Sequence, residues 1–214
     1  MPRPNLFALI SLSSACLMIT GCAVTLNSSV PFHYVPSLTA SEPNAYRLGV
    51  DKLRDQRPDE DRETTEHISD VDEKITSKLI DDLQKSNLFA RVSYPPRKDS
   101  DDFALQGEIR RFYWKASPNA LIWIPIINLL IYFGAPAAVV ESYVGLHVRL
   151  TDSKSGTVVG EYKKFASRQN SYSIYDNLQA GEAGAELADA LREVVKTIKE
   201  EMLADLRKHR EVVK

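Results

Sequence analysis

Cysteine is scarce in this chain. The 214 residues include 2 cysteines, Cys16 and Cys22, and both lie near the N-terminus. Beyond Cys22 no thiol is present to form a disulfide, to bind a metal or to act as a nucleophile. The sequence therefore excludes a disulfide-stapled scaffold and any cysteine-based metal or catalytic site in the rest of the chain.

Motifs for catalysis and cofactor binding are also lacking. None of the 4 histidines stands in a metal-ligand spacing such as HExxH, and no P-loop, G-x-S-x-G or G-x-G-x-x-G sequence is present. We expect His147 to lie on the outward face of a strand as a surface side chain. We therefore predict that the protein is not an enzyme and holds no metal and no cofactor. A pair of carboxylates in a cleft, as in a glycosidase, is an alternative that the sequence leaves open.

Charge is not concentrated in a basic patch. The formal net charge is −2, and no Lys/Arg-rich run is present, which argues against nucleic acid as a partner. The stretch 51–73 is strongly acidic, but it lacks EF-hand spacing. Such a stretch, punctuated by Pro58, is typical of a solvated loop.

Residues 1–21 have the anatomy of a secretory signal. Arg3 supplies a positive start, residues 6–19 form a short apolar run, and two small residues follow. The sequence Ile19-Thr20-Gly21-Cys22 resembles the lipobox of bacterial lipoproteins. This resemblance implies that the thiol of Cys22 takes a diacylglycerol and that Cys22 becomes the new N-terminus.

Lipidation at Cys22 implies an address in the cell envelope. A mature lipoprotein carries at least two acyl chains, which hold a protein firmly to membrane lipid. Ala23 stands where an Asp would retain such a lipoprotein at the inner membrane. For a Gram-negative source, the resemblance therefore implies the outer membrane, with the protein facing the periplasm.

The rest of the chain predicts a tether and one domain. Residues 22–45 are rich in Ser, Pro and Asn and are typical of an extended tether. Within the domain, 46–214, period-two alternation predicts strands and a four-residue apolar spacing predicts helices. The expected strands are 45–53, 90–94, 103–115, 143–150 and 157–167, and the expected helices are 71–87 and 183–207. This order predicts an α+β, two-layer domain with a mixed or antiparallel sheet of about four to five strands, two amphipathic helices on one face and an apolar helical insertion.

Several segments together carry a family resemblance. The lipobox, a strand leading into LRDQR, a helix ending in SNLFARV, the strand FALQGEIRRFYW and the hairpin VGLHVRLTDSKSGTVVGEY resemble small Gram-negative lipoproteins. These include the YajG-like and transport-auxiliary lipoproteins, whose domain is similar to the N-terminal domain of TolB. The resemblance covers about residues 46–207. It implies an accessory role in envelope assembly or transport, with no catalytic residues to carry over.

The run from Ala120 to Val140 contains no charged residue. It is long enough for a transmembrane helix, but four residues interrupt it: Pro125, Asn128, Gly134 and Pro136. A spanning helix would also place residues 141–214 across a membrane from the first half of the predicted sheet. Pore-forming barrel strands would alternate apolar and polar residues, and LIWIPIINLLIY does not.

We favour an apolar insertion, 117–140, between two strands of one sheet. It would form a helix or helical hairpin from Leu121 to Phe133, followed by a Gly-Ala-Pro-Ala return. A helix that is apolar on every side must be covered on every side, and an exposed patch of this size marks a membrane or protein contact. Burial in the domain core is the alternative. The predicted contact residues are Leu121, Ile122, Trp123, Ile124, Ile126, Ile127, Leu129, Leu130, Ile131, Tyr132 and Phe133.

These features predict a lipid-anchored, non-enzymatic accessory or adaptor lipoprotein of the envelope. Its expected partners are membrane lipid, through the acyl chains on Cys22, and a membrane or envelope protein, through the insertion. One alternative is a structural or pore-type lipoprotein that self-assembles through the same segment. A third hypothesis is an enzyme that modifies the cell wall or lipid.

Overall fold

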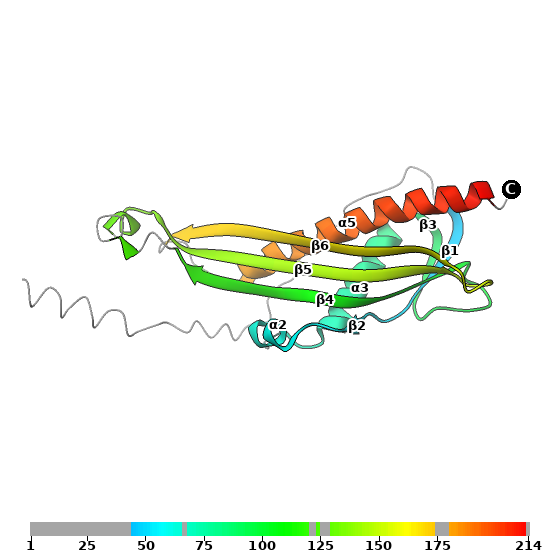
Figure 1. Ribbon diagram of the computed structural model, residues 1–214, viewed down its shortest axis with the longest axis horizontal. Helices are drawn as coiled ribbons and strands as arrows, with labels where there is room; N and C mark the ends of the chain where they lie inside the picture. The colour runs from blue at the N-terminus through cyan, green and yellow to red at the C-terminus, as the bar shows by residue number, and fades with distance from the viewer. Residues whose placement is uncertain (1–43, 66–67, 120–122, 125–128, 174–179, 213–214) are drawn as a thin grey trace, which may run out of the picture.

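The computed structural model describes residues 44–65, 68–119, 123–124, 129–173 and 180–212. They form one mixed β-sheet with helices packed against it, and the three longest strands run along the long axis of the molecule (Figure 1). This arrangement confirms the predicted α+β class.

The sheet has six strands. Their order is β3-β1-β4-β5-β6, and β2 pairs with β4 off this path. β1 is parallel to both β3 and β4, whereas β4, β5 and β6 are antiparallel neighbours. The bounds are β1 (Asn44–Val50), β2 (Arg54–Asp55), β3 (Phe89–Ser93), β4 (Phe103–Pro118), β5 (Pro136–Asp152) and β6 (Val158–Ser173).

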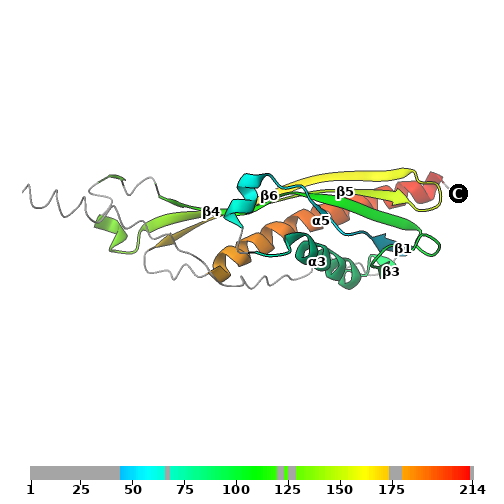
Figure 2. The same cartoon turned by 90° about the horizontal axis from the view of Figure 1, so that it is seen from below.

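Three helices contact this sheet. α3 (Val71–Lys85) and α5 (Ala180–Val212) lie on one face, as the two-layer prediction requires, and α2 (Asp59–Thr64) lies on the opposite face beside β4 (Figure 2). We call the face that carries α3 and α5 the inner face and the other the outer face. At 1.5 Å per residue, α5 is about 50 Å long, so it follows most of the length of the strands.

The core lies between the inner face and the two long helices. Alternate residues of β5 point into it, and each is at most 1% exposed: Val144, Leu146, Val148 and Leu150. The apolar stripe expected on the last helix is buried throughout: Leu187, Leu191, Val194, Ile198, Met202 and Leu206. The two periodicities that predicted these faces are confirmed.

The acidic stretch is not a solvated loop throughout, and that prediction is wrong for its middle part. It contains β2 and α2, which are held against β4. The buried Arg57 forms two hydrogen bonds to the carboxylate of Asp55, each 2.9 Å long, and donates a third to the carbonyl oxygen of Phe112 at 3.2 Å. Asp61, which is 3% exposed, accepts a 2.8 Å hydrogen bond from Nε of Arg111. Asp61 is buried because β4 supplies its charged partner. The charge of Arg57 is compensated within the same stretch by Asp55, and β4 adds a carbonyl acceptor.

Three strands are longer than their predicted bounds. β4 continues to Pro118 rather than ending at Lys115, β5 begins at Pro136 rather than at Tyr143, and β6 continues to Ser173 rather than ending at Ser167. The added part of β6 is polar, yet it contacts α5 through ion pairs and hydrogen bonds. Arg168 pairs with Glu193, and Nδ2 of Asn170 donates to Glu186 over 2.6 Å. This part of β6 lacks the apolar alternation that predicts a strand, because its polar side chains find their hydrogen-bond and charge partners on α5.

The Asp55–Arg57 contact predicts a pH dependence of stability. The hydrogen bonds from Arg57 lower the pKa of Asp55 below its ordinary value of 3.8. A carboxyl whose pKa is lowered by folding contributes stability above the ordinary pKa and loses it as the pH falls through the folded-state pKa. We expect wild type to lose more stability than Asp55→Asn between about pH 5 and pH 2. Urea unfolding across this range measures the difference. Asp59→Asn, at a side chain that is 94% exposed, is the matched control. An equal loss of unfolding free energy for wild type and Asp55→Asn as the pH falls would contradict the stabilising role of the Asp55–Arg57 contact.

Candidate functional site

The connection between β4 and β5 carries an exposed apolar surface. We define the apolar tip as six described side chains with exposed fractions from 46% to 79%: Trp123, Ile124, Leu129, Leu130, Tyr132 and Phe133. The connection lies at one end of the molecule, and the β5–β6 turn lies at the other (Figures 1 and 2). The long β4–β5 hairpin thus places these side chains away from the core.

The second half of the tip has a defined backbone geometry. Residues 129–131 are helical, and the turn that follows closes with two hydrogen bonds, from the Ala135 N–H to the Leu130 carbonyl at 3.0 Å and from the Gly134 N–H to the Ile131 carbonyl at 3.1 Å. Gly134 has φ = 92°, a value that glycine adopts without strain. This is the Schellman arrangement that ends many helices. It reverses the chain into β5 and leaves Tyr132 and Phe133 on the outside.

The structure describes seven of the predicted contact residues and separates them into two groups. Ile131 is 8% exposed and packs inward, whereas the six residues of the apolar tip are exposed. Core burial, the alternative interpretation of this segment, is therefore wrong for those six. Cys22, Leu121, Ile122, Ile126 and Ile127 lie outside the described residues, as do Pro125 and Asn128. In the described part of the expected 121–133 helix, residues 129–131 are helical and residues 132–133 belong to a turn.

Among the described residues, no helix combines the length and the apolar character needed to cross a bilayer. The same part of the chain holds no cluster of three or more His, Cys, Asp or Glu side chains with the geometry of a metal site.

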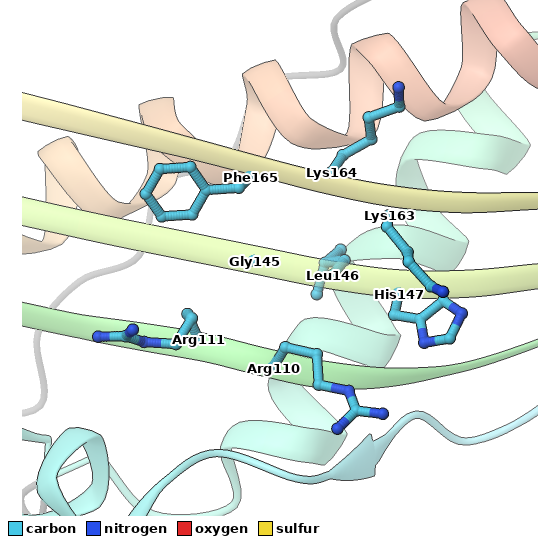
Figure 3. A pocket seen from close by; sticks show the side chains of 8 residues that line it. All are labelled: Arg110, Arg111, Gly145, Leu146, His147, Lys163, Lys164 and Phe165. Atoms are coloured by element: carbon cyan, nitrogen blue, oxygen red, sulfur yellow. The ribbon is translucent and has the colours of Figure 1, made fainter.

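A second candidate site is a pocket of about 370 Å³ on the outer face (Figure 3). Its centre is Gly145 in β5, which pairs with Arg111 in β4 and with Phe165 in β6. The missing side chain leaves a hollow between these two neighbours. A shift in the β4 register between Ile109 and Arg111 is a β-bulge, which places Arg110 and Arg111 at the same pocket. The complete lining is Arg110, Arg111, Gly145, Leu146, His147, Lys163, Lys164 and Phe165.

The cations around this pocket are paired with acids. Arg110 contacts Glu108, Arg111 lies 2.8 Å from Asp61, and Lys163 lies 3.1 Å from Glu161. The hydrogen bond from Lys163, followed by the one with His147, lowers the pKa of the Glu161 carboxyl. Each of these three cations therefore has a carboxylate beside it that offsets part of its charge.

His147 belongs to this network. Its Nε2 lies 2.7 Å from Oε1 of Glu161, and its Nδ1 lies 3.8 Å from Glu108. The side chain is 17% exposed and points to the outer face, which confirms the predicted direction. An aromatic row continues beside the pocket, where Tyr143 stacks on Tyr113 at 4.6 Å and on Phe165 at 5.8 Å.

Sequence reasoning did not identify the pocket. One local signal was available, because Gly145 occupies an outward position in the alternating strand Tyr143–Leu150 and so marks a gap in a row of side chains. The partners of that gap depend on the register of three strands and on a bulge, which no local pattern specifies.

The comparisons show what the chain is similar to. Neither a protein-family model nor a curated protein sequence matches it. Among solved structures, a Xanthomonas campestris protein of the DUF330 family matches with a TM-score of 0.55 at 13% identity, over 84% of this chain and 96% of that protein. A homologue of neuraminyllactose-binding hemagglutinin from Helicobacter pylori has a TM-score of 0.49 at 13% identity, over 86% and 99%. Rare lipoprotein B from Shewanella oneidensis has a TM-score of 0.44 at 13% identity, over 77% of this chain and 98% of that protein. The first of these likenesses shows that the chain shares the fold of a DUF330 protein, and the two weaker ones carry no inference.

Proposed function

We propose that the protein is a lipid-anchored, non-enzymatic accessory lipoprotein of the bacterial envelope, and that the apolar tip is its contact surface. The observation that carries this proposal is the exposure of the tip. Phe133 is 79% exposed, Trp123 66%, Tyr132 65% and Leu129 63%. Large apolar side chains gathered on one exposed surface mark a contact with a membrane or with another protein.

Two further features support the proposal. The lipobox sequence at Cys22 would hold the domain beside a membrane, where a contact surface is useful. The resemblance to YajG-like and transport-auxiliary lipoproteins implies an accessory role of the same kind. The outer-face pocket supports a catalytic role less well, because its Arg110, Arg111 and Lys163 are engaged in ion pairs with neighbouring carboxylates.

A triple substitution in the tip tests the proposal. We expect Leu129→Ser/Tyr132→Ser/Phe133→Ser to change the free energy of unfolding by no more than about 0.5 kcal/mol, because exposed side chains contribute little to the core. The mature chain from residue 22, with Cys22→Ser, is mixed with isolated envelope membranes and sedimented. We expect the wild-type tip to bring the protein down with the membranes and the triple variant to remain in solution.

A matched control is available at the opposite end of the molecule. Val158 is an exposed apolar side chain, 47% accessible, at the start of β6. Val158→Ser should sediment like wild type. Equal sedimentation of wild type and the triple variant would refute the proposal.

The self-assembling alternative makes a different prediction in the same experiment. If copies bind one another through the tip, the mature chain is oligomeric in sedimentation equilibrium, and the triple variant is monomeric. A monomeric wild type that binds envelope membranes supports the accessory role.

A further inference from the structure

We infer that the apolar tip inserts into the interface of a lipid bilayer, and that this is the same bilayer that holds the acyl chains on Cys22. The inference rests on the proposed function, because it names the partner of the same surface. The distribution of charge around the tip favours lipid over a protein, and the kind of aromatic side chains in the tip and the length of chain before β1 agree with a bilayer.

The end of the sheet that carries the tip has no charge on any of its three strands. Lys115 and Glu141 are register partners in β4 and β5, and they form the last row with charged side chains. Beyond this row, residues 116–119, 136–140 and 169–173 contain no Asp, Glu, Lys or Arg. At about 3.3 Å per residue, the four residues 116–119 separate that row from the tip by about 13 Å. The carboxylate of Glu186 in α5 accepts a hydrogen bond from Asn170, one row nearer the tip and about 10 Å from residue 119. Interfacial segments sink about 5–10 Å into a bilayer, so the tip can insert without burying a charge.

A protein partner would call for a different surface. Protein interfaces surround an apolar centre with a polar rim, and complementary charges across the interface fix the partner's orientation. The rows beside the tip are polar at positions such as Asn119 and Ser171 but carry no charge, and the described part of the tip includes Trp123 and Tyr132. These two residue types are enriched where a membrane meets water, because each joins an apolar ring to one polar group.

The chain before β1 is long enough to reach the same bilayer. β1 pairs with the beginning of β4, at Phe103, so it lies at the end of the sheet away from the tip (Figure 1). Residues 22–43 can span at most roughly 70–80 Å when fully extended. Phe103 pairs with Leu48, so the start of β1 at Asn44 lies about 13 Å farther from the tip, and with the sixteen residues of β4 the length to be spanned is about 65 Å. An acylated Cys22 can therefore lie in the bilayer that the tip enters, because the chain before β1 can run back along the whole length of the sheet.

Trp123 reports insertion directly. The chain has 2 tryptophans, so Trp114→Phe in the mature Cys22→Ser chain leaves Trp123 as the only one. With phosphatidylcholine vesicles, we expect the emission of Trp123 to shift to shorter wavelength and to be quenched by lipids brominated near the headgroup end of the acyl chain. Vesicles containing phosphatidylglycerol should give a similar response, because the tip carries no charge. Leu129→Ser/Tyr132→Ser/Phe133→Ser in the same background should abolish the shift.

Flotation with the same vesicles is a second measurement of binding. It uses the chain that retains Trp114, so its result is independent of the Trp114→Phe substitution. An unshifted emission together with failure to float would overturn the inference. An equal shift in the triple variant would overturn it as well. Where lipid vesicles give no binding but the wild-type protein still sediments with envelope membranes, which contain protein, the proposed function stands and only the lipid assignment fails. If binding to envelope membranes is also lost, both fail.

Dilution distinguishes the anchoring bilayer from an opposing one. The lipidated protein is reconstituted in brominated vesicles, and an excess of empty, unbrominated vesicles is added. Quenching of Trp123 should persist, because tip and anchor occupy one bilayer. Loss of quenching on dilution would show contact with a second bilayer and would overturn that part of the inference.

Discussion

Replacement of Lys199 by methionine is expected to lower the free energy of unfolding by about 3–5 kcal/mol, the range found when one partner of a buried ion pair is removed. Lys199 in α5 contacts Asp82 in α3, and neither side chain has any exposed surface. The pair joins the two long helices beneath the sheet. Without the ammonium group, the carboxylate of Asp82 remains buried with its main compensating charge removed. Urea unfolding monitored by circular dichroism measures the loss.

Two comparisons make this prediction specific. Lys196 lies one turn away on α5, is 53% exposed and pairs with Glu200 at 4.0 Å. Lys196→Met should change stability by no more than about 0.5 kcal/mol, as is usual for exposed pairs. The double variant Lys199→Met/Asp82→Leu should recover most of the loss, because an apolar pair of similar size removes both buried charges. A loss below about 1 kcal/mol for Lys199→Met alone would contradict the account.

Arg57→Ala has the second largest expected effect on stability. Its guanidinium group holds Asp55, donates to Oγ1 of Thr65 at 2.7 Å and donates to the carbonyl oxygen of Phe112 at 3.2 Å. Removal leaves buried acceptors without this donor and weakens the attachment of β2 and α2 to β4, which then depends on the β2–β4 pairing and the Asp61–Arg111 contact. We expect a loss of about 2–4 kcal/mol, since a hydrogen bond to a charged group contributes about 1.5–3 kcal/mol and an unsatisfied buried group costs a similar amount.

The fork of the guanidinium group is the feature under test. Arg57→Lys keeps the positive charge but cannot form the two-pronged contact with Asp55, so most of the loss should remain. Arg54→Ala removes a guanidinium from a side chain that is 73% exposed, and its pair with Glu108 should contribute about 0.5 kcal/mol or less. Equal effects of Arg57→Ala and Arg54→Ala would show that Arg57 does not hold the two elements together.

Local periodicity predicted the parts of the fold that depend on local patterns. The four-residue spacing on α5 and the alternation on β5 are properties of contiguous sequence, and both mark the buried faces correctly. β2 and α2 were missed for the opposite reason. The buried carboxylate of Asp61 pairs with Arg111 of β4, and the buried guanidinium of Arg57 donates to a carbonyl of β4 as well as to its neighbour Asp55. β4 is about fifty residues away in the sequence. A strongly acidic stretch resembles a solvated loop until its distant partners are known.

The two candidate sites differ in the same way. The apolar tip was predicted because a long uncharged run is visible in the sequence, although the run alone did not separate the buried Ile131 from its exposed neighbours. The outer-face pocket was not predicted, because its hollow at Gly145 requires the register of β4, β5 and β6 and the bulge before Arg111. Alternation indicates which face a side chain occupies, but not which side chains meet across strands.

Photo-crosslinking at a single position tests the central claim most directly. A photoreactive amino acid replaces Phe133 at the tip in one variant and Val158, at the far end of the sheet, in the other, and the lipidated protein is irradiated in intact envelopes. The account predicts label transfer to an envelope component from position 133 and little or none from position 158. Equal labelling from both positions, or none from position 133, would contradict the claim that the apolar tip is the contact surface.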